Sequence, residues 1–198
     1  MKFVLATQNP KKLKEMSAIL SDLGVEVVSE ADLGVKIEVE ETGETFAENS
    51  LLKAKAVMEA TKLPAIADDS GLCVDALNGG PGVYSARFGG EGLDDKGRYT
   101  LLLEMLRGQT DRAAHFHTSI VCAFPNGDEL VCEGECPGTI AFAPMGENGF
   151  GYDPVFFVPD KRKTFAQLSA EEKAEISHRG KALRAFKETL KNYLAEHQ

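Results

Sequence analysis

Residues 3–24 read FVLATQNPKKLKEMSAILSDLG and carry the signals of a strand, a turn and a helix in that order. The first four residues are apolar without polar alternation, which is typical of a strand buried on both faces. Asn9 suits the N-cap of a helix and Pro10 its first position, and apolar residues then recur at helical spacing until Gly24. This order predicts the first unit of an α/β fold.

The segments that follow continue the alternation of strands and helices. Val35–Glu40 alternates apolar and charged residues, which predicts a half-buried strand. Thr45 and Glu48 form a capping box, so we expect a helix that starts there and ends before Leu63-Pro64. Ala65–Ala67 is short and apolar and predicts a second strand buried on both faces.

A glycine-rich stretch and two predicted helices lie further along the chain. Gly79–Gly92 holds six glycines and one proline, so we expect a loop or a lid there. A helix is predicted next, ending at Gly108. Ser169 and Glu172 make another capping-box pattern, and a terminal helix follows with an apolar stripe.

A long antiparallel hairpin is predicted in the middle of the chain. Residues 114–124 alternate apolar and polar, and the sequence Pro-Asn-Gly-Asp then marks a tight turn into a second strand. A two-residue turn would place His117 opposite Cys136, with Cys132 on the same face. This spacing fits no common zinc motif, so we expect buried thiols.

The composition is that of an ordinary globular protein. The chain has 198 residues, 43% hydrophobic and 27% charged, which predicts over residues 1–198 one domain or two small lobes that share one core, and excludes disordered or fibrous classes. A net charge of −9 predicts that nucleic acid and anionic membranes are not partners. Because no apolar run approaches the roughly 18 residues of a membrane helix, we expect a cytoplasmic protein with reduced cysteines.

A candidate anion site lies at Thr7–Lys12, where a buried strand meets the start of a helix. Free N–H groups and the helix dipole favour an anion there, and Lys11, Lys12 and Lys14 add positive charge. The segment matches neither the P-loop nor the dinucleotide fingerprint. A capped helix start with solvated lysines is the alternative interpretation.

Two groups of acids are candidates for metal binding or for acid–base chemistry. Asp68 and Asp69 directly follow a buried strand, where ligands bind in α/β sheets and where a cation offsets the repulsion of adjacent carboxylates. Glu38, Glu40 and Glu41 end the predicted alternating strand. The alternatives are a solvated Asp-Ser-Gly turn and the wet face of a strand. Lysines offer further charge near these acids, and of the two on the second predicted helix we favour Lys53.

A third candidate region combines aromatic and basic residues. Phe150–Pro154 is a constrained turn that presents two aromatics and one carboxylate, a platform suited to a flat base. Lys173 and Ser177–Arg179 offer hydrogen-bond donors for a carbonyl group or a phosphate. Core aromatics and ordinary surface charges are the alternative interpretations.

Six motifs in fixed order resemble the inosine triphosphate pyrophosphatase family, and together they span nearly the whole chain. They are T-x-N-x-x-K at Thr7–Lys12, E-E-T-G-x-T-F-x-E-N at Glu40–Asn49, A-D-D-S-G at Ala67–Gly71, P-G-x-Y-S-A-R at Pro81–Arg87, F-G-Y-D-P at Phe150–Pro154 and S-H-R at Ser177–Arg179. The resemblance implies one domain, in which an elongated mixed sheet with flanking helices forms two lobes around a central cleft. It also implies a homodimer, Mg²⁺, and hydrolysis of inosine, deoxyinosine and xanthosine triphosphates to the monophosphate and pyrophosphate.

The same resemblance distributes roles over the motif residues. It implies that Asp69 binds the metal and accepts a proton, with Asp68 and Lys53 shaping its field and Glu40 or Glu41 completing the metal site. The substrate-binding residues that it implies are Thr7, Gln8, Asn9, Pro10, Lys11, Lys12, Ser70, Phe150, Gly151, Tyr152, Asp153, Lys173, His178 and Arg179. Gln8 departs from the family pattern, which has glycine in many relatives, and this bears on the detailed phosphate geometry.

Two other functions fit the same residues. A non-catalytic nucleotide sensor would bind in the same way and report occupancy through Gly79–Gly92. A metal-dependent phosphatase would release single phosphates in place of pyrophosphate. The paired aspartates favour a hydrolase over a sensor, because a sensor gains little from carboxylates beside phosphates.

Overall fold

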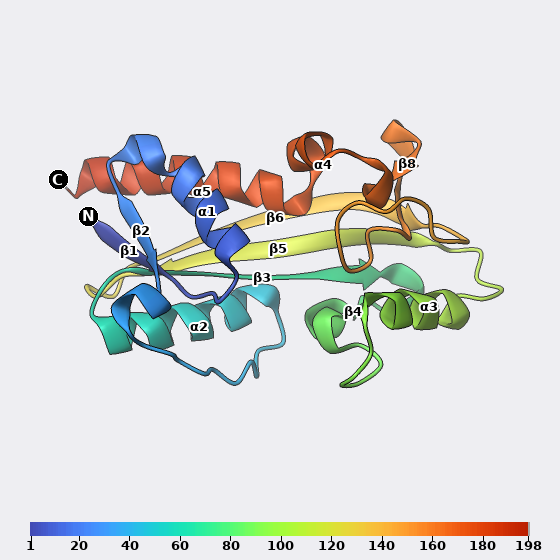
Figure 1. Cartoon of the computed structure of the whole chain (residues 1–198), viewed down its shortest axis with the longest axis horizontal. Helices are drawn as coiled ribbons and strands as arrows, with labels where there is room; N and C mark the ends of the chain where they lie inside the picture. The colour runs from blue at the N-terminus through green and yellow to red at the C-terminus, as the bar shows by residue number, and fades with distance from the viewer. Residues whose placement is uncertain (198) are drawn as a thin grey trace. The chain divides into compact units, whose positions relative to one another are not determined.

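The computed structural model describes residues 1–197, and its contacts divide the chain into two compact units. Unit 1 comprises Met1–Asp69, Thr118–Glu133 and Ala182–Gln198, and unit 2 comprises Ser70–His117 and Gly134–Lys181. Figure 1 labels the elements, whose colours follow the chain from blue to red. Each unit is built from segments that are distant in sequence.

The strands form a mixed sheet in the order β2-β1-β3-β5-β6-β7-β8, with β4 paired to β3. β1 runs parallel to β2 and β3, whereas β4, β7 and β8 pair antiparallel. The bounds are β1 Lys2–Leu5, β2 Glu26–Ser29, β3 Ala65–Val74, β4 Gly80–Pro81, β5 Ala113–Ala123, β6 Glu129–Ile140, β7 Phe156–Val158 and β8 Lys163–Thr164. The structure confirms the mixed α/β class.

The α-helices are α1 Pro10–Ile19, α2 Phe46–Thr61, α3 Asp95–Met105, α4 Ala170–Ile176 and α5 His178–Glu196. Short 3₁₀ helices cover Ser21–Leu23, Ala31–Leu33, Asp75–Leu77, Gly82–Arg87, Pro159–Lys161 and Phe165–Gln167. Among the described residues, no helix is both long enough and apolar enough to cross a membrane.

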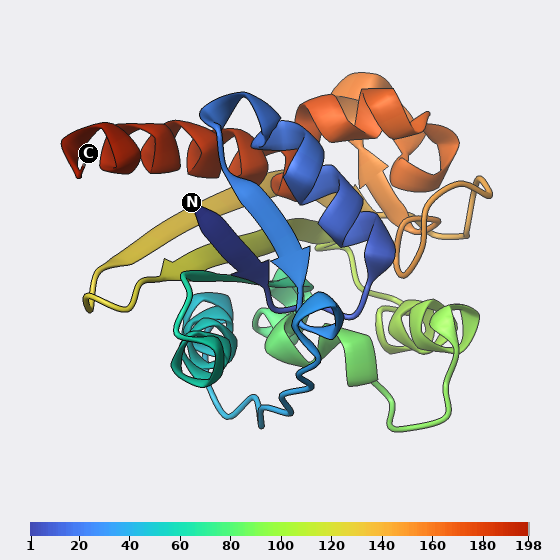
Figure 2. The ribbon, with the colours of Figure 1, turned by 60° about the vertical axis from the view of Figure 1, so that its left-hand side comes forward.

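Unit 1 has a layer of helix on each face of its strands, which Figures 1 and 2 show from two directions. Phe3 and Leu5 pack with α1 and α5, whereas Val4 between them packs with α2. Successive strand residues point to opposite faces, so burial on both faces requires this uninterrupted apolar run. The prediction for β1 is therefore confirmed.

Unit 2 has one continuous apolar core. The strands β3, β5 and β6 contribute alternate residues to it, and α3 contributes Leu102 and Leu106. Phe116 packs at its centre, where its ring centroid lies 4.6 Å from that of Phe156 and 5.5 Å from that of Phe165. The residues on either side of Phe116 point away from this core, so the other face of β5 stays free to carry polar side chains.

Helix starts follow their local sequence signals. The Asn9 side chain accepts a hydrogen bond from the Lys11 N–H, and Pro10 opens α1 as predicted. Thr45 and Glu48 form the predicted capping box at α2. At α4, only the half in which Ser169 accepts from the Glu172 N–H is present.

Three predictions of secondary structure are wrong. Val35–Glu40 alternates in exposure but pairs with no described strand, because its Ile37 N–H bonds to the Glu30 carboxylate instead of to a neighbouring strand. Gly79–Gly92 is partly regular, with β4 and a 3₁₀ helix. β3 does not end at Ala67 but continues to Val74, so Asp68 and Asp69 lie within a strand and not in a turn.

The hairpin between β5 and β6 has a different register from the one predicted. The Phe124 N–H bonds to the Asp128 carbonyl, and Gly127 in the turn between them has φ 95°. This conformation is typical of a three-residue hairpin loop. His117 therefore contacts Glu135 through its Nδ1 at 2.9 Å, while Cys136 belongs to the buried core.

Candidate active site

The segment Thr7–Pro10 leaves the end of β1 and enters α1. Its side chains organise it locally: Thr7 accepts from the Asn9 N–H at 3.2 Å, and Asn9 accepts from the Lys11 N–H at 2.9 Å. The segment also lines a cavity of about 440 Å³ together with Ser29–Ala31 and Val35. That volume lies within the range of small-molecule sites.

The first turn of α1 is basic, which by itself costs helix stability. Positive charge at a helix N-terminus opposes the dipole, and no acidic residue compensates for it in that turn. Lys12 instead pairs with Asp68, with 2.7 Å between Nζ and Oδ2. The Asp68 side chain is only 4% exposed and that of Lys12 35% exposed, so a nearly buried carboxylate holds the lysine at this position.

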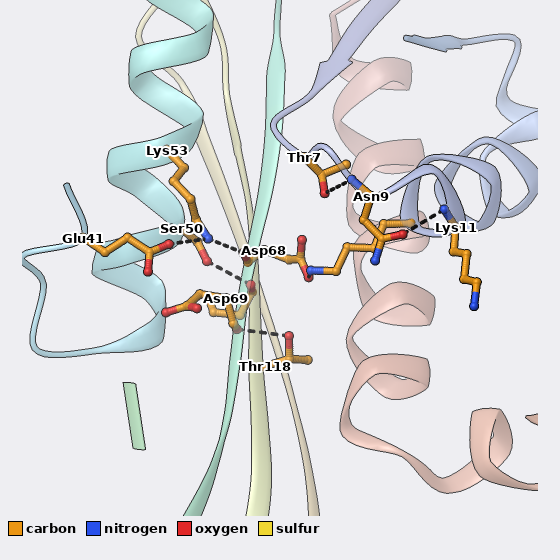
Figure 3. Close-up of polar contacts among 11 residues, drawn as sticks. Thr7, Asn9, Lys11, Glu41, Ser50, Lys53, Asp68, Asp69 and Thr118 are labelled. Carbon is orange, nitrogen blue, oxygen red and sulfur yellow. Dashed lines mark hydrogen bonds and ion pairs between the residues drawn. The ribbon is translucent and has the colours of Figure 1, made fainter. Parts of the chain in front are cut away.

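Asp68 and Asp69 point to opposite sides of β3, as successive strand residues must. Figure 3 shows Asp68 directed towards the segment that carries Thr7 and Asn9, and Asp69 on the side of Glu41. The Asp69 main-chain carbonyl accepts a hydrogen bond from the Thr118 hydroxyl at 3.1 Å. Asp68, which pairs with Lys12, and Asp69 thus lie on opposite sides of the same strand.

Lys53 connects α2 to the acidic residues. Its Nζ donates to the Asp68 carbonyl at 2.7 Å and pairs with Glu41 Oε1 at 2.9 Å. Glu40, by contrast, is exposed. Between the two glutamates that the sequence left undecided, Glu41 is thus the one whose carboxylate the fold holds beside β3.

A close backbone contact fixes the loop that carries Glu41. The Gly43 N–H donates to Asn49 Oδ1 at 2.8 Å, and a Cβ at Gly43 would lie only 2.7 Å from the same oxygen. Asn49 is fully buried in α2. Glycine at position 43 therefore allows the loop to lie against α2.

The acids of unit 1 offer an all-oxygen donor set. Mg²⁺ takes one or two carboxylates, keeps several waters and accepts substrate phosphate oxygens. Asp69 and Glu41 meet that requirement, and Lys53 holds both the Glu41 carboxylate and the main chain of β3. The chemistry of these donors therefore suits a hard divalent cation.

In unit 2, Asp153 and Lys173 form a buried ion pair. The distance between Lys173 Nζ and Asp153 Oδ2 is 2.6 Å, and the two side chains are 19% and 4% exposed. The Asp153 carboxylate also accepts from the Phe150 N–H at 3.1 Å. Gly149 has φ 75°, and a Cβ there would overlap Asp153 Oδ2, so glycine is required beside this carboxylate.

Aromatic rings flank the Lys173 ammonium. It lies 4.7 Å from the centroid of Phe150 and 5.3 Å from that of Phe165. Phe150 is 74% exposed, whereas Phe165 is buried. Burial raises the pKa of Asp153 above its ordinary value, although Lys173 acts to lower it. The pair is therefore in a dry environment, with one exposed ring beside it.

His178 opens α5 and stacks on the aromatic core. Its ring lies 4.7 Å from that of Phe116 at an interplanar angle of 13°. Burial, reinforced by the nearby charges of Lys173 and Arg179, lowers the pKa of His178 from 6.5 to about 3. The imidazole is therefore neutral near pH 7, with one N–H donor and one acceptor nitrogen.

Tyr152 and Gly151 have structural partners. Tyr152 is 6% exposed, and its hydroxyl donates to the Ser85 carbonyl at 2.6 Å. The Gly151 N–H donates to Asp95 at 2.8 Å. Of the two aromatics in this turn, Tyr152 packs in the core and Phe150 is presented to solvent.

Comparison with known proteins identifies the family to which this chain belongs. A sequence profile of the Ham1 family matches residues 3–189. The chain belongs to the Ham1 family. The resemblance inferred from the six motifs is thus confirmed at the level of family.

Members of the Ham1 family match this chain over nearly its full length. The dITP/XTP pyrophosphatase of Shigella flexneri is 51% identical over 195 residues, which cover 96% of this chain and 98% of that protein. That of Haemophilus influenzae is 53% identical over 193 residues, with the same coverage. The structure of the Staphylococcus aureus Ham1 protein has a TM-score of 0.93 and 43% identity, covering 98% of this chain and 100% of that one.

The positions that the sequence predicted for this Ham1 chain fall into both units. Thr7–Lys12, Glu41, Lys53, Asp68 and Asp69 lie in unit 1, and Ser70 directly follows Asp69 in β3. Phe150–Asp153, Lys173, His178 and Arg179 lie in unit 2. Sequence analysis did not identify Thr118 or Phe116 as supporting residues, because alternation along β5 marks both only as core positions.

Proposed function

We propose that this protein hydrolyses the triphosphates of inosine, deoxyinosine and xanthosine to the monophosphate and pyrophosphate, and so removes non-standard purines from the nucleotide pool. The names of the relatives support this activity. The structural observation that carries it is the cluster in unit 1, in which Lys12 and Lys53 hold Asp68 and Glu41 next to Asp69.

In this proposal the two ends of the substrate are bound by different residues. Thr7–Lys12 bind the triphosphate, with help from Ser70. The N–H groups and lysines at the start of α1 suit phosphate oxygens. Phe150, Asp153, Lys173, His178 and Arg179 bind the nucleoside, because they combine an exposed ring with buried, oriented donors. Gly151 and Tyr152 support this second group from within the fold.

Asp69 is the proposed proton acceptor. A water oxygen forms a new bond to the α-phosphorus, the bridging P–O bond breaks, and pyrophosphate leaves with its electron pair. Asp69 takes the proton of that water, a task suited to a carboxylate held by its own main chain to Thr118. Lys12 offsets the charge of Asp68, so the neighbouring carboxylate does not add uncompensated repulsion towards the phosphates.

We also propose Mg²⁺ as the metal, with Asp69 and Glu41 as the protein ligands. When bound, the ion would neutralise charge on the phosphates and on the leaving pyrophosphate. An acidic chain needs such a cation to accept a polyanion. A homodimer and a cytoplasmic location complete the proposal, and both rest on the resemblance to the family.

Selection of the base follows from donors in unit 2. A 6-oxo group accepts a hydrogen bond from a neutral His178, from Lys173 or from Arg179. The 6-amino group of adenine would face those donors without an acceptor, and a buried unpaired donor costs about 1–3 kcal/mol. We therefore expect inosine and xanthosine triphosphates to be preferred over adenosine triphosphate.

Product identification tests the function. The purified full-length chain is incubated with Mg²⁺ and inosine, xanthosine or adenosine triphosphate, and pyrophosphate and orthophosphate are measured separately. Pyrophosphate released faster from the first two nucleotides supports the proposal. Equal rates on all three would contradict the selectivity, orthophosphate as the initial product would indicate a phosphatase, and tight binding without product would indicate a sensor.

A further inference from the structure

In unit 2, two histidines and a glutamate lie together on one side of the strands β5 and β6. His115 and His117 are two residues apart in β5 and therefore share a face, and Glu135 lies in the neighbouring strand β6. One donor atom from each residue lies within 4.8 Å of the other two. Among residues 1–197, no other three histidine, cysteine or acidic side chains meet this criterion.

An ion pair between His117 and Glu135 explains only part of this arrangement. His117 Nδ1 lies 2.9 Å from Glu135 Oε1. This ion pair needs only one histidine and one carboxylate, so it does not account for His115. The ring of His115 lies 6.4 Å from that of His117, centroid to centroid, at an interplanar angle of 59°. A second imidazole at this position turns a paired histidine into a three-donor chelate.

We propose that His115, His117 and Glu135 form a binding site for a zinc-like divalent ion, separate from the magnesium site proposed in unit 1. Two imidazole nitrogens and one carboxylate oxygen are a donor set that Zn²⁺ takes with a water in its fourth position. Zinc–ligand bonds of about 2.0–2.1 Å place tetrahedral donors roughly 3.3–3.5 Å apart. The donor atoms lie within 4.8 Å of one another, so an ion would have to draw them together by at most roughly 1.3–1.5 Å to reach that spacing.

The site is accessible and selective. The side chains of His117 and Glu135 are 17% and 57% exposed, so an ion reaches them from solvent. The nearby Lys181 ammonium donates to the main-chain carbonyl of Glu135 at 2.8 Å, and the Glu135 carboxylate remains paired with His117. Imidazole suits zinc and other late first-row metals, whereas Mg²⁺ prefers oxygen donors. The ion would join β5 to β6 and stabilise unit 2.

Zinc titration of the full-length chain tests this site. The protein is first treated with a chelator, then titrated with Zn²⁺ in a buffer that contains excess Mg²⁺, and binding is followed by calorimetry and by the histidine ring signals in NMR spectra. We expect one ion per chain, a higher melting temperature and shifts of the His115 and His117 signals. His115→Ala and Glu135→Gln should each weaken binding at least tenfold, because even partners of metal ligands contribute that much.

Two control variants separate this site from other zinc ligands. His197→Ala removes a histidine that lies 3.7 Å from Asp128, a histidine–carboxylate pair without a second imidazole, and should leave zinc affinity unchanged. Cys132→Ser removes a buried cysteine of β6 that packs in the core of unit 1, and should also leave it unchanged. Zinc affinity that survives His115→Ala and Glu135→Gln, or that is lost in either control, would overturn the proposal.

Discussion

Two aspartates, one in each unit, pair with a lysine in different surroundings. Asp68 is paired with Lys12, and a second lysine, Lys53, bonds its main-chain carbonyl. Asp153 is paired with Lys173, whose ammonium lies beside the rings of Phe150 and Phe165. The first pair belongs to a network of charges, and the second is flanked by two aromatic rings.

The difference between the two pairs indicates what each can bind. A network of lysines and carboxylates suits a polyanion together with a cation. A phosphate can replace a carboxylate as the partner of a lysine, and the cation can bind the carboxylate. Burial beside rings orients donors and excludes water, which strengthens each hydrogen bond and suits a flat polar base. The raised pKa of Asp153 and the lowered pKa of His178 both report this dry environment.

Asp69→Asn should produce the largest effect of any change to the charged cluster. Asparagine keeps the shape of the side chain but cannot take a proton from water, so turnover should fall about a thousandfold, within the range of general-base contributions. Nucleotide binding should persist. Steady-state release of pyrophosphate and calorimetric binding of inosine triphosphate measure the two effects.

Asp160→Asn is the matched control for that change. Asp160 is exposed and lies in unit 2, and its replacement by asparagine removes the same charge from the protein. It should keep the activity of the unmodified chain. Turnover of Asp69→Asn within a few-fold of this control would remove Asp69 from the chemistry.

His178→Gln should change the pH dependence of stability, a smaller effect. The pKa of His178 is about 3 in the folded protein against an ordinary 6.5, so the unfolded chain binds the proton first as the pH falls. In the unmodified protein, the free energy of unfolding should therefore fall as the pH drops from 6.5 to 3, by at most about 1.4 kcal/mol per pH unit. The His178→Gln variant should lack this part of the decrease. Urea unfolding from pH 4.5 to 7.5 measures it.

The comparison with His178→Gln isolates one residue. The raised pKa of Asp153 has the opposite sign, because its stabilising contribution is lost as the pH rises, but this term is common to both proteins and cancels in the difference. A flat difference between His178→Gln and the unmodified protein would show that His178 is not buried as described.

Local signals in the sequence were sufficient for the helix starts. Asn9, Pro10 and the Thr45–Glu48 capping box act within a few residues of themselves, so their effect can be predicted without the fold. The same holds for β1, whose apolar run demands burial on both faces. The motif residues identified the family because their order and spacing are properties of the chain alone.

Non-local pairing determined what could not be predicted. β3 continues through Asp68 and Asp69 because its neighbours in the sheet supply partners for a polar segment that resembles a turn. Val35–Glu40 has the alternation of a strand, but the Glu30 carboxylate takes a main-chain N–H that a sheet would use. The register that brings Glu135 to His117 depends on a three-residue loop in place of a two-residue one.

The central claim assigns the two ends of the substrate to two groups of residues. The charged cluster of unit 1, which contains Lys12 and Asp68, binds the triphosphate, and the aromatic cluster of unit 2, which contains Phe150 and Lys173, binds the base. Ligand affinities test this claim most directly. Calorimetry would compare inosine triphosphate with inorganic tripolyphosphate in Lys12→Met, in Lys14→Met as its control on the same helix, and in Phe150→Ala. Lys12→Met should weaken both ligands by about tenfold relative to Lys14→Met, as the loss of a charged contact of roughly 1.4 kcal/mol does. Phe150→Ala should weaken only the nucleotide, since it removes a stacking contact of about 1–3 kcal/mol. Equal loss of both ligands in both variants would contradict the claim.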